Sequence, residues 1–530
     1  METYHFSPPP RAKEGGVRLR VALVYPNSYA VGMDNLGFQG VFRLLASSTS
    51  VHCERVFYER DRRCISLESH LRLNEFDVVA FSISFENDYI NVLRMLKDSA
   101  IEPLASNRDE RSPLLLAGGA ATTINPEPMT PFMDAIFLGE ADEAIQEIVG
   151  RCSELEERGR QPVLKSLALV EGVYVPSIQS PFLGEGRDVA GTVRRRVVRD
   201  PSTTFCSTAV SSPRSHLGGM FLAEAVRGCS RKCRFCAATC IYAPLRYVPA
   251  DSLLARVWQA GSSVRTVGLV GACVSEHPDL VPVARALVER GIRVSVSSLR
   301  ADIGASEILE LLARSGTRTV TIAPEAGTRE MRKLVNKELA EDSLEETVAA
   351  ARDSGLASLR LYFMVGLPGE KLEDVMAIVS LVESVSSRFR AGKKARHVTV
   401  SVSPFVPKAW TPFQWCPMDE RGALRTKMQT LSRQLSRLKG VRFKPQGLRS
   451  SFLQAALSRG SWKTGLALHA MVFEGLSART AWKRAGLEFD SEVFSARELG
   501  AALAWDHLDV VPSRERLRKE YEKAFGGGPG

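Results

Sequence analysis

Three cysteines of this chain, Cys229, Cys233 and Cys236, follow one another with the spacing C-x3-C-x2-C. Thiolates are the protein ligands of iron–sulfur clusters, and three thiolates on one tight loop can hold three irons of a cubane [4Fe-4S] cluster. The fourth iron then has no protein ligand, so a small molecule can bind to it. The spacing therefore predicts a cluster whose open corner is the reactive position.

Zinc and disulfide chemistry are the other uses of closely spaced cysteines. Structural zinc takes four closed ligands, usually from two distant C-x2-C pairs. Cys240 follows Cys236 at a further C-x3-C spacing and would complete a set of four. We favour the cluster and interpret Cys240 as a small buried apolar residue. The sequence shows no signal peptide and no apolar run long enough to cross a membrane, so we expect a reducing, cytoplasmic location in which disulfides are rare.

The composition is typical of a globular protein with more than one domain. The chain has 530 residues, of which 44% are hydrophobic and 25% charged, and a chain of this length forms about two to four domains. The net charge of +10 would suit a nucleic acid or another anionic partner. The basic residues are scattered, however, and the nearest approach to a patch is Arg194, Arg195 and Arg196. We therefore do not favour nucleic acid.

Residues 1–155 alternate apolar runs with helical patterns. The run 18–25 is continuously apolar, as buried parallel strands are, and helical spacing follows at 35–45. Further strands are predicted at 77–85, 113–117 and 134–138, and further helices at 88–101 and 141–152. This alternation predicts an α/β fold with a doubly wound parallel sheet, which binds ligands at the carboxyl ends of its strands.

Small and polar residues follow the predicted strand ends of this block. Glycine at such a position lets the backbone approach a flat or phosphate-bearing ligand, although ordinary turns use glycine as well. The candidate ligand-loop residues are Tyr29, Gly37, Ser82, Ser84, Gly118, Gly119 and Gly139. The first strand is not followed by G-x-G-x-x-G, which argues against a dinucleotide.

The rest of the chain reads as a connector, a second α/β block and a tail. Residues 156–218 are a predicted connector of short strand-like pieces among Ser, Pro and Gly. Residues 219–440 hold six strand–helix units, which predict a partial (β/α)6 barrel, open on one side, with its active site at the strand carboxyl ends. The strands are predicted at 220–226, 265–270, 293–297, 318–322, 358–365 and 397–402. Residues 441–530 are a predicted helical C-terminal region with a packing role.

The stretch 226–236, with its three cysteines, resembles the cluster motif of the radical S-adenosylmethionine (radical SAM) enzymes. The resemblance implies that S-adenosylmethionine chelates the open iron through its amino and carboxylate groups. An electron from the cluster then cleaves a carbon–sulfur bond, and the resulting 5′-deoxyadenosyl radical takes a hydrogen from a substrate. The protein supplies position and exclusion, and a flavodoxin- or ferredoxin-type protein supplies the electron.

The same resemblance assigns roles at the ends of the first barrel strands. Phe235 occupies the aromatic position near the adenine, with loop packing as its alternative. Gly268 and Gly271 lie where related enzymes use a Gly-Gly-Glu-like motif to accept the methionine ammonium. The acidic residue of that motif is missing here, so backbone carbonyls would serve, with Glu276 as an outside candidate.

Later strand ends carry further expected contacts with S-adenosylmethionine. Ser297 and Arg300 end the third strand, and the fork of Arg300 matches a carboxylate, although a surface ion pair explains it equally well. By resemblance, Glu325 would bind the ribose hydroxyls or the methionine end. Gly366 would let the backbone approach the adenine, and Glu370 caps the next helix.

The N-terminal block resembles the cobalamin-binding-like domain of many radical SAM proteins. The likeness lies in the stretches 25–39, 117–120 and 139–143. The chain lacks the Asp-x-His-x-x-Gly motif that supplies a histidine to cobalt, a motif that radical SAM cobalamin enzymes often lack too. The resemblance implies possible cobalamin binding and favours methyltransferase-like chemistry, either methylation or rearrangement at an unactivated carbon.

Two other functions stay open. In the first, the N-terminal domain holds no cobalamin and the enzyme modifies RNA, protein or a small metabolite. In the second, of another class, the protein is a non-catalytic iron–sulfur sensor or scaffold. Methylthio transfer is disfavoured because Cys53, Cys64 and Cys152 are too dispersed for a second cluster.

Overall fold

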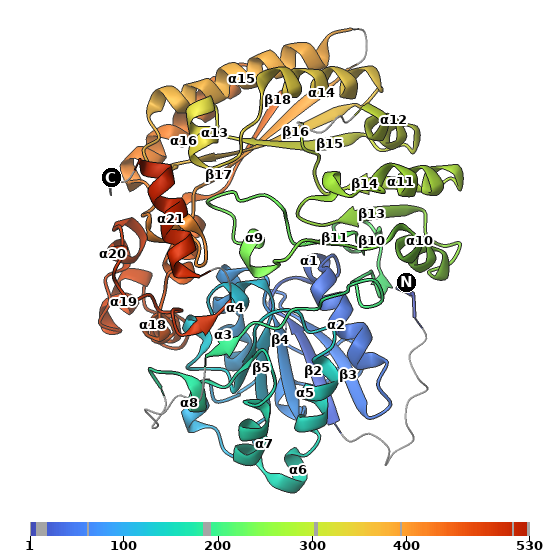
Figure 1. The fold of residues 1–530 in the computed structure, drawn as a ribbon. Coiled ribbons are helices and arrows are strands. Elements are labelled where there is room, and N and C mark those ends of the chain that lie inside the picture. Colours follow the sequence, from blue (N-terminus) through green and yellow to red (C-terminus); the bar gives the residue numbers. More distant parts are fainter. Residues whose placement is uncertain are drawn as a thin grey trace. The chain divides into compact units, whose positions relative to one another are not determined.

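Figure 1 shows the computed structural model, which describes residues 2–6, 19–60, 63–183, 192–301, 306–392, 395–510 and 513–526. The chain forms two compact units. The sheet unit contains Met1–Gly219, Ala456–Glu492 and Gly500–Val511, and the barrel unit contains Met220–Ala455, Val493–Leu499 and Pro512–Gly530. The C-terminal region therefore contributes segments to both units, which are described separately below.

A six-stranded sheet in the order β3-β2-β4-β5-β6-β7 forms the centre of the sheet unit. The parallel strands are β2 (Leu19–Tyr25), β3 (Val51–Phe57), β4 (Val78–Ser82), β5 (Leu114–Gly118) and β6 (Ala135–Phe137), and β7 (Val173–Tyr174) is antiparallel. The predicted doubly wound parallel sheet is confirmed, with residue 18 outside the described residues. The strand order reverses between β2 and β4, and their carboxyl ends are where such sheets bind ligands.

The strands and helices of this sheet follow from their apolar patterns. In β2, every residue except Arg20 is buried, as expected for a strand covered on both faces. The main helices of the unit are α2 (Leu36–Ala46), α3 (Tyr89–Asp98), α5 (Ile145–Cys152) and α7 (Arg160–Leu167). The Asn35 side chain caps α2 by accepting a hydrogen bond from the Phe38 N–H at 2.9 Å.

C-terminal segments complete the sheet unit. Helix α18 (Trp462–Phe473) packs against α3 and the short helix η4 (Glu127–Met129), and α19 (Ala478–Arg484) packs against α18. Gly465 permits this approach, because a Cβ atom there would lie 2.4 Å from the Pro128 carbonyl oxygen. Strand β19 (Leu508–Asp509) pairs in parallel with β8 (Val193–Arg194).

The barrel unit holds two groups of parallel strands. The first is β10 (Phe221–Glu224), β13 (Thr266–Val270) and β14 (Arg293–Val296); the second is β15 (Thr319–Glu325), β16 (Ser358–Val365), β17 (His397–Pro404) and β18 (Val441–Pro445). A parallel bridge between Leu299 and Ile322 links the groups. The predicted α/β barrel fold is confirmed, with β18 as a parallel strand beyond the six that were expected.

The barrel strands alternate with helices that lie on the outer side of the sheet (Figure 1). These helices are α10 (Ala250–Gln259), α11 (Leu280–Glu289), α12 (Ser306–Arg314), α13 (Arg329–Leu334), α14 (Glu341–Asp353), α15 (Leu372–Arg390) and α16 (Arg421–Leu435). The helical C-terminal region is also confirmed, and it ends in α21 (Arg514–Phe525). Within the described ranges, no helix combines the length and apolarity that a membrane span requires.

Candidate iron–sulfur site

The three cysteines lie on a loop that begins where the first barrel strand ends. The predicted strand 220–226 is divided into β10 and a short strand β11 (Val226–Arg227), which pairs antiparallel with β12 (Arg246–Tyr247). Gly228 follows with φ +84°, and a Cβ atom there would lie 2.5 Å from the Pro244 carbonyl oxygen. Glycine is therefore required for the chain to enter this loop.

Cys229, Cys233 and Cys236 line one cavity of about 210 Å³ in the barrel unit. The lining also includes Phe235 from the same loop, and Cys273, Arg300, Glu325 and Lys337 from segments that follow later strands. The structure thus brings Phe235, Arg300 and Glu325 together with the cysteines. Three thiolates on one loop, facing one cavity, fit a cubane cluster held at three of its corners.

The pKa values of the cysteine thiols around this cavity shift in opposite directions. Burial raises the pKa of Cys233 to about 12, whereas a hydrogen bond with Cys273 lowers the pKa of Cys229 to about 6. In the part of the chain that the structure describes, no three His, Cys, Asp or Glu side chains are placed to hold a single metal ion. A cubane does not require such a group, because each thiolate binds a different iron.

Cys273 is a site residue that the sequence analysis missed. Its thiol donates a hydrogen bond to the Gly228 carbonyl oxygen at 3.6 Å, and the hydrogen bond with Cys229 raises the pKa of Cys273. The residue is buried, with 3% of its surface exposed. Its place just after Gly271 and Ala272, at the end of a predicted strand, was the signal that could have found it.

Glu276 forms hydrogen bonds and ion pairs with polar side chains of the cluster loop and with Arg300. It accepts hydrogen bonds from Ser230 Oγ at 2.5 Å and Arg231 Nε at 2.6 Å, and Arg300 Nε lies 3.7 Å from it. Arg300 therefore lines the cavity, as a partner for a ligand carboxylate would, and it also takes part in an ion pair with Glu276. Each of the two roles expected for it has some support.

Glu325 ends β15 in a strained conformation. Its φ of +68° lies in the left-handed region, which non-glycine residues seldom adopt and which is enriched at functional sites. The register between β15 and β16 shifts between Ile322 and Glu325. The carboxylate pairs with Lys337 Nζ at 2.7 Å, and both side chains are largely buried.

Four other expected contacts of S-adenosylmethionine have explanations within the chain. A Cβ atom at Gly271 would lie 2.6 Å from the Val226 carbonyl oxygen, and one at Gly268 would meet Leu222 at 2.7 Å. Ser297 Oγ donates to the Gly271 carbonyl oxygen at 3.0 Å. None of Gly268, Gly271, Ser297 and Gly366 lines the cavity described above. Their contacts with S-adenosylmethionine stay predictions.

Glu370 supports the Gly366 turn, which corrects its expected role as a helix cap. Its Oε2 accepts the Gly366 N–H at 2.6 Å and lies 3.0 Å from Lys427 Nζ, and burial raises the pKa of Glu370 to about 7. Helix α15 is instead capped at Lys371, whose N–H donates to Asp374. Gly366 has φ +77°, and a Cβ atom there would lie 2.6 Å from Leu424.

In the sheet unit, several candidate ligand-loop residues make close contacts within the protein, at positions where a ligand was expected. Gly119 (φ +115°) and Gly139 (φ +112°) are required because Cβ atoms would lie 2.5 Å from the Ile83 oxygen and 2.1 Å from the Arg196 oxygen. Ser84 Oγ accepts a hydrogen bond from Asn35 at 2.9 Å. These glycine loops thus do not by themselves form a cradle for a bound group.

The other four candidate ligand-loop residues are Ser82, Gly118, Gly37 and Tyr29. Ser82 and Gly118 are register partners at the ends of β4 and β5, and a Cβ atom at Gly118 would make an ordinary contact of 3.7 Å with Phe137. Gly37 lies in the first turn of α2. Tyr29 Oη donates to Glu2 at 2.5 Å.

Two buried acids, Glu86 and Asp88, lie just beyond the β4 carboxyl end. Glu86 is 2% exposed and accepts a hydrogen bond from Ser458 Oγ at 3.0 Å. Burial raises the pKa of Asp88 to about 6, and Asn27 donates to this carboxylate at 2.9 Å. A short polar segment after a strand was their only sequence signal.

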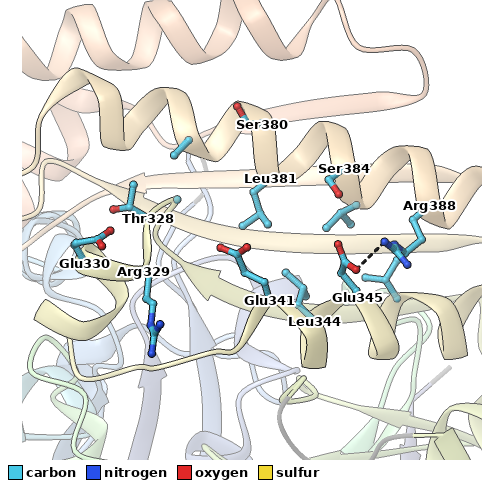
Figure 2. Close-up of a pocket in the computed structure, with 14 residues that line it drawn as sticks. Thr328, Arg329, Glu330, Glu341, Leu344, Glu345, Ser380, Leu381, Ser384 and Arg388 are labelled. Atoms are coloured by element: carbon cyan, nitrogen blue, oxygen red, sulfur yellow. Dashed lines mark hydrogen bonds and ion pairs between the residues drawn. The ribbon is translucent and has the colours of Figure 1, made fainter.

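A larger cavity, of about 420 Å³, lies between α14 and α15 on the outer helical layer (Figure 2). Figure 2 shows Glu345 of α14 paired with Arg388 of α15, at 2.7 Å, beside Glu341 and Ser384. The cavity holds no cysteine and none of the predicted site residues. The three cysteines line the smaller cavity instead.

Two family descriptions match this chain. Residues 37–176 match "Radical SAM proteins, N-terminal", and residues 224–382 match "Radical SAM superfamily". An uncharacterized protein of Methanocaldococcus jannaschii is 28% identical over 444 residues, which cover 83% of this chain and 88% of that protein.

One solved structure with a TM-score above 0.5 supports the fold. The structure of the cobalamin-dependent S-adenosylmethionine radical enzyme OxsB, with aqua-cobalamin and S-adenosylmethionine bound, matches with a TM-score of 0.52 and 14% identity. The match covers 69% of this chain and 52% of OxsB, so this chain spans about half of that enzyme. The radical S-adenosylmethionine methyltransferase TsrM of Kitasatospora setae matches with a TM-score of 0.49 and 14% identity, over 73% of this chain and 72% of TsrM.

Proposed function

Since this chain belongs to the radical SAM superfamily, we propose that it is an enzyme that cleaves S-adenosylmethionine reductively at a [4Fe-4S] cluster held by Cys229, Cys233 and Cys236. Superfamily membership implies both the cluster and S-adenosylmethionine. The observation that carries the proposal is that all three cysteines line one cavity with Glu325 and Arg300, at the strand carboxyl ends of a partial barrel.

The residues of this chain position and enclose the reagents. When bound, the cluster supplies the electron that splits S-adenosylmethionine into methionine and a 5′-deoxyadenosyl radical. The three thiolates leave one iron open for S-adenosylmethionine. Arg300 and Glu325 present charges of opposite sign in the same cavity, as recognition of an amino acid end and a ribose requires. A bound cluster would need an external one-electron reductant, and a flavodoxin- or ferredoxin-type protein is suited to that role.

For the specific reaction, we propose methylation or rearrangement at an unactivated carbon. In this version the sheet unit holds cobalamin. The strand reversal between β2 and β4 supports this version, because it creates a ligand-binding edge. The cobalamin-free version is favoured by Gly119 and Gly139, whose close contacts are with this chain's own backbone. In that version the radical acts directly on RNA, protein or a metabolite.

The test is anaerobic purification, reconstitution with iron and sulfide, and reduction with dithionite, each with and without cobalamin. We expect 5′-deoxyadenosine from S-adenosylmethionine, and a perturbed paramagnetic signal when S-adenosylmethionine meets the reduced cluster. An intact cluster that never cleaves S-adenosylmethionine would instead indicate a sensor or scaffold. A stoichiometric corrinoid spectrum after gel filtration selects the cobalamin version, and its absence selects the other.

A further inference from the structure

One buried arginine, Arg234, connects the cluster loop to other segments of the barrel unit by hydrogen bonds. Arg234 lies between Cys233 and Cys236 and is 9% exposed. Its guanidinium donates to the carbonyl oxygens of Lys333 at 3.1 Å and Leu334 at 2.7 Å, and its N–H donates to that of Val335 at 3.0 Å. The loop is thereby tied to the end of α13.

The same arginine meets the C-terminal part of the barrel unit. Its carbonyl oxygen accepts the Phe413 N–H at 3.2 Å, and its guanidinium pairs with Glu520 of α21 at 3.6 Å. A buried guanidinium requires a partner of opposite charge. Glu520 supplies that charge from a helix nearly three hundred residues further along the chain.

Aromatic contacts hold α21 in place at this point. Phe413 and Trp415 belong to the short helix η6 (Pro412–Trp415) and are fully buried. The ring of Phe525 lies 5.9 Å from that of Phe413, and the ring of Tyr521 lies 5.8 Å from that of Trp415. One face of α21 therefore packs on η6, while Glu520 reaches Arg234.

We propose that α21 is a brace for the cluster loop: Glu520, Tyr521 and Phe525 act through Arg234 and η6 to keep Cys233 and Cys236 in ligating positions. Glu520 is thus a positioning residue, and this role rests on the proposed function. Glu520 also pairs with Lys523 of its own helix at 2.8 Å, as Glu515 does with Lys519. A comparison of the two glutamates therefore isolates the contact with Arg234.

The experiment compares Glu520→Gln with Glu515→Gln in the full chain. Glu515 lies on the same helix, is highly exposed and pairs with Lys519, so its variant matches the change in charge. After anaerobic reconstitution, we measure the rate at which an iron chelator bleaches the cluster, together with thermal unfolding. We expect roughly fivefold faster bleaching for Glu520→Gln, unchanged bleaching for Glu515→Gln, and unfolding temperatures that match.

A chain ended after residue 512 removes the whole brace, and more than about tenfold faster bleaching is expected. If this chain does not fold, Glu520→Gln alone decides the matter. Equal bleaching rates for wild type and Glu520→Gln would overturn the brace, while failure of the wild type to hold a cluster would overturn the proposed function instead. Amide hydrogen exchange of residues 229–236 in the apoprotein tests the brace without any cluster, and we expect faster exchange in Glu520→Gln only.

Discussion

The two units use the carboxyl ends of their parallel strands differently. In the barrel unit, the cysteine loop, Arg300 and the strained Glu325 face one cavity. In the sheet unit, Gly119 and Gly139 contact backbone of their own chain. The comparison teaches that glycine at a strand end indicates a ligand only when the space beside it is not already filled by the protein.

The largest expected effect tests the barrel side of this comparison. Replacing Cys233 by alanine should remove the cluster and reduce S-adenosylmethionine cleavage below detection, because one corner of the cubane loses its ligand. Iron content and 5′-deoxyadenosine formation are the measurements. Cys152→Ala, a buried change in the sheet unit, should keep both. A Cys233→Ala protein that still cleaves S-adenosylmethionine would remove this loop from the site.

The sheet side is tested by Gly139→Ala. Its φ of +112° and the Arg196 oxygen 2.1 Å from a Cβ atom leave no room for a methyl group, so the free energy of unfolding should fall by about 3 kcal/mol. Urea denaturation measures this, with Gly150→Ala, where a Cβ atom meets nothing within 4 Å, as control. Unchanged stability with loss of corrinoid binding would make Gly139 a ligand loop after all.

Glu325→Gln sharpens the role of the charged residues in the cavity. The variant keeps the side-chain size but loses the charge that pairs with Lys337. If this carboxylate binds S-adenosylmethionine, the dissociation constant should rise by about 10- to 100-fold, measured by titration of the reconstituted protein. Glu330→Gln, on α13 and outside this cavity, is the control. Equal affinity in both variants would leave Glu325 with a structural role.

A pH titration probes the buried polar groups of the sheet unit. Burial raises the pKa of Glu127 to about 8, so the folded state binds a proton that the unfolded state releases near its ordinary pKa. Stability from this group is therefore present below pH about 4.5 and is lost as the pH rises to about 8, by up to about 1.4 kcal/mol per unit. Glu127→Gln should remove that loss, so its stability relative to wild type should rise with pH across this window.

The neighbouring histidine provides the control for that titration. Burial lowers the pKa of His507 to about 4, so its contribution to stability rises with pH and is complete above its unfolded pKa of about 6.5. His507 Nε2 lies 3.4 Å from Glu127, and the two trends oppose each other below this pH. The clearest measurement is urea unfolding from pH 6.5 to 8. A wild-type stability that stays flat there would contradict the assignment.

The smallest expected effect concerns Cys273, at the edge of the barrel site. Hydrogen bonds to cluster sulfurs help to set the reduction potential. If the Cys273 thiol donates to the sulfur of Cys229 when the cluster is bound, Cys273→Ala should shift the potential to a more negative value without loss of iron. Potentiometric titration followed by paramagnetic resonance measures this. Cys64→Ala, in the sheet unit, should leave the potential unchanged.

Local sequence patterns predicted most of the fold. The apolar run of β2 and the cysteine spacing were sufficient for the first strand and the cluster loop. Strand β3 was missed because its buried Arg55 pairs with Glu2 at 2.7 Å and Glu68 at 2.8 Å, so charged residues hide its apolar pattern. Strand β18 was missed because most of it is exposed and it lies at the edge of its sheet, paired with β17.

The sequence predicted the part of the candidate site whose residues lie close together in the chain. The spacing of the three cysteines was enough to group them. The contacts of Cys273 with Cys229 and of Glu520 with Arg234 depend on tertiary packing across long stretches of chain, which one sequence does not encode in any local pattern. The pairing of Glu325 with Lys337 likewise required the strained turn at the end of β15.

The last part of the chain passes four times from one unit to the other, with Ala456–Glu492 and Gly500–Val511 in the sheet unit and Val493–Leu499 and Pro512–Gly530 in the barrel unit. During synthesis, therefore, neither unit has all of its residues until the late segments Gly500–Val511 and Pro512–Gly530 have been made. Domains usually fold in turn as they emerge. Here the N-terminal half must wait for its closing helices, so separately expressed halves cut after Gly219 should be aggregation-prone and in need of chaperones.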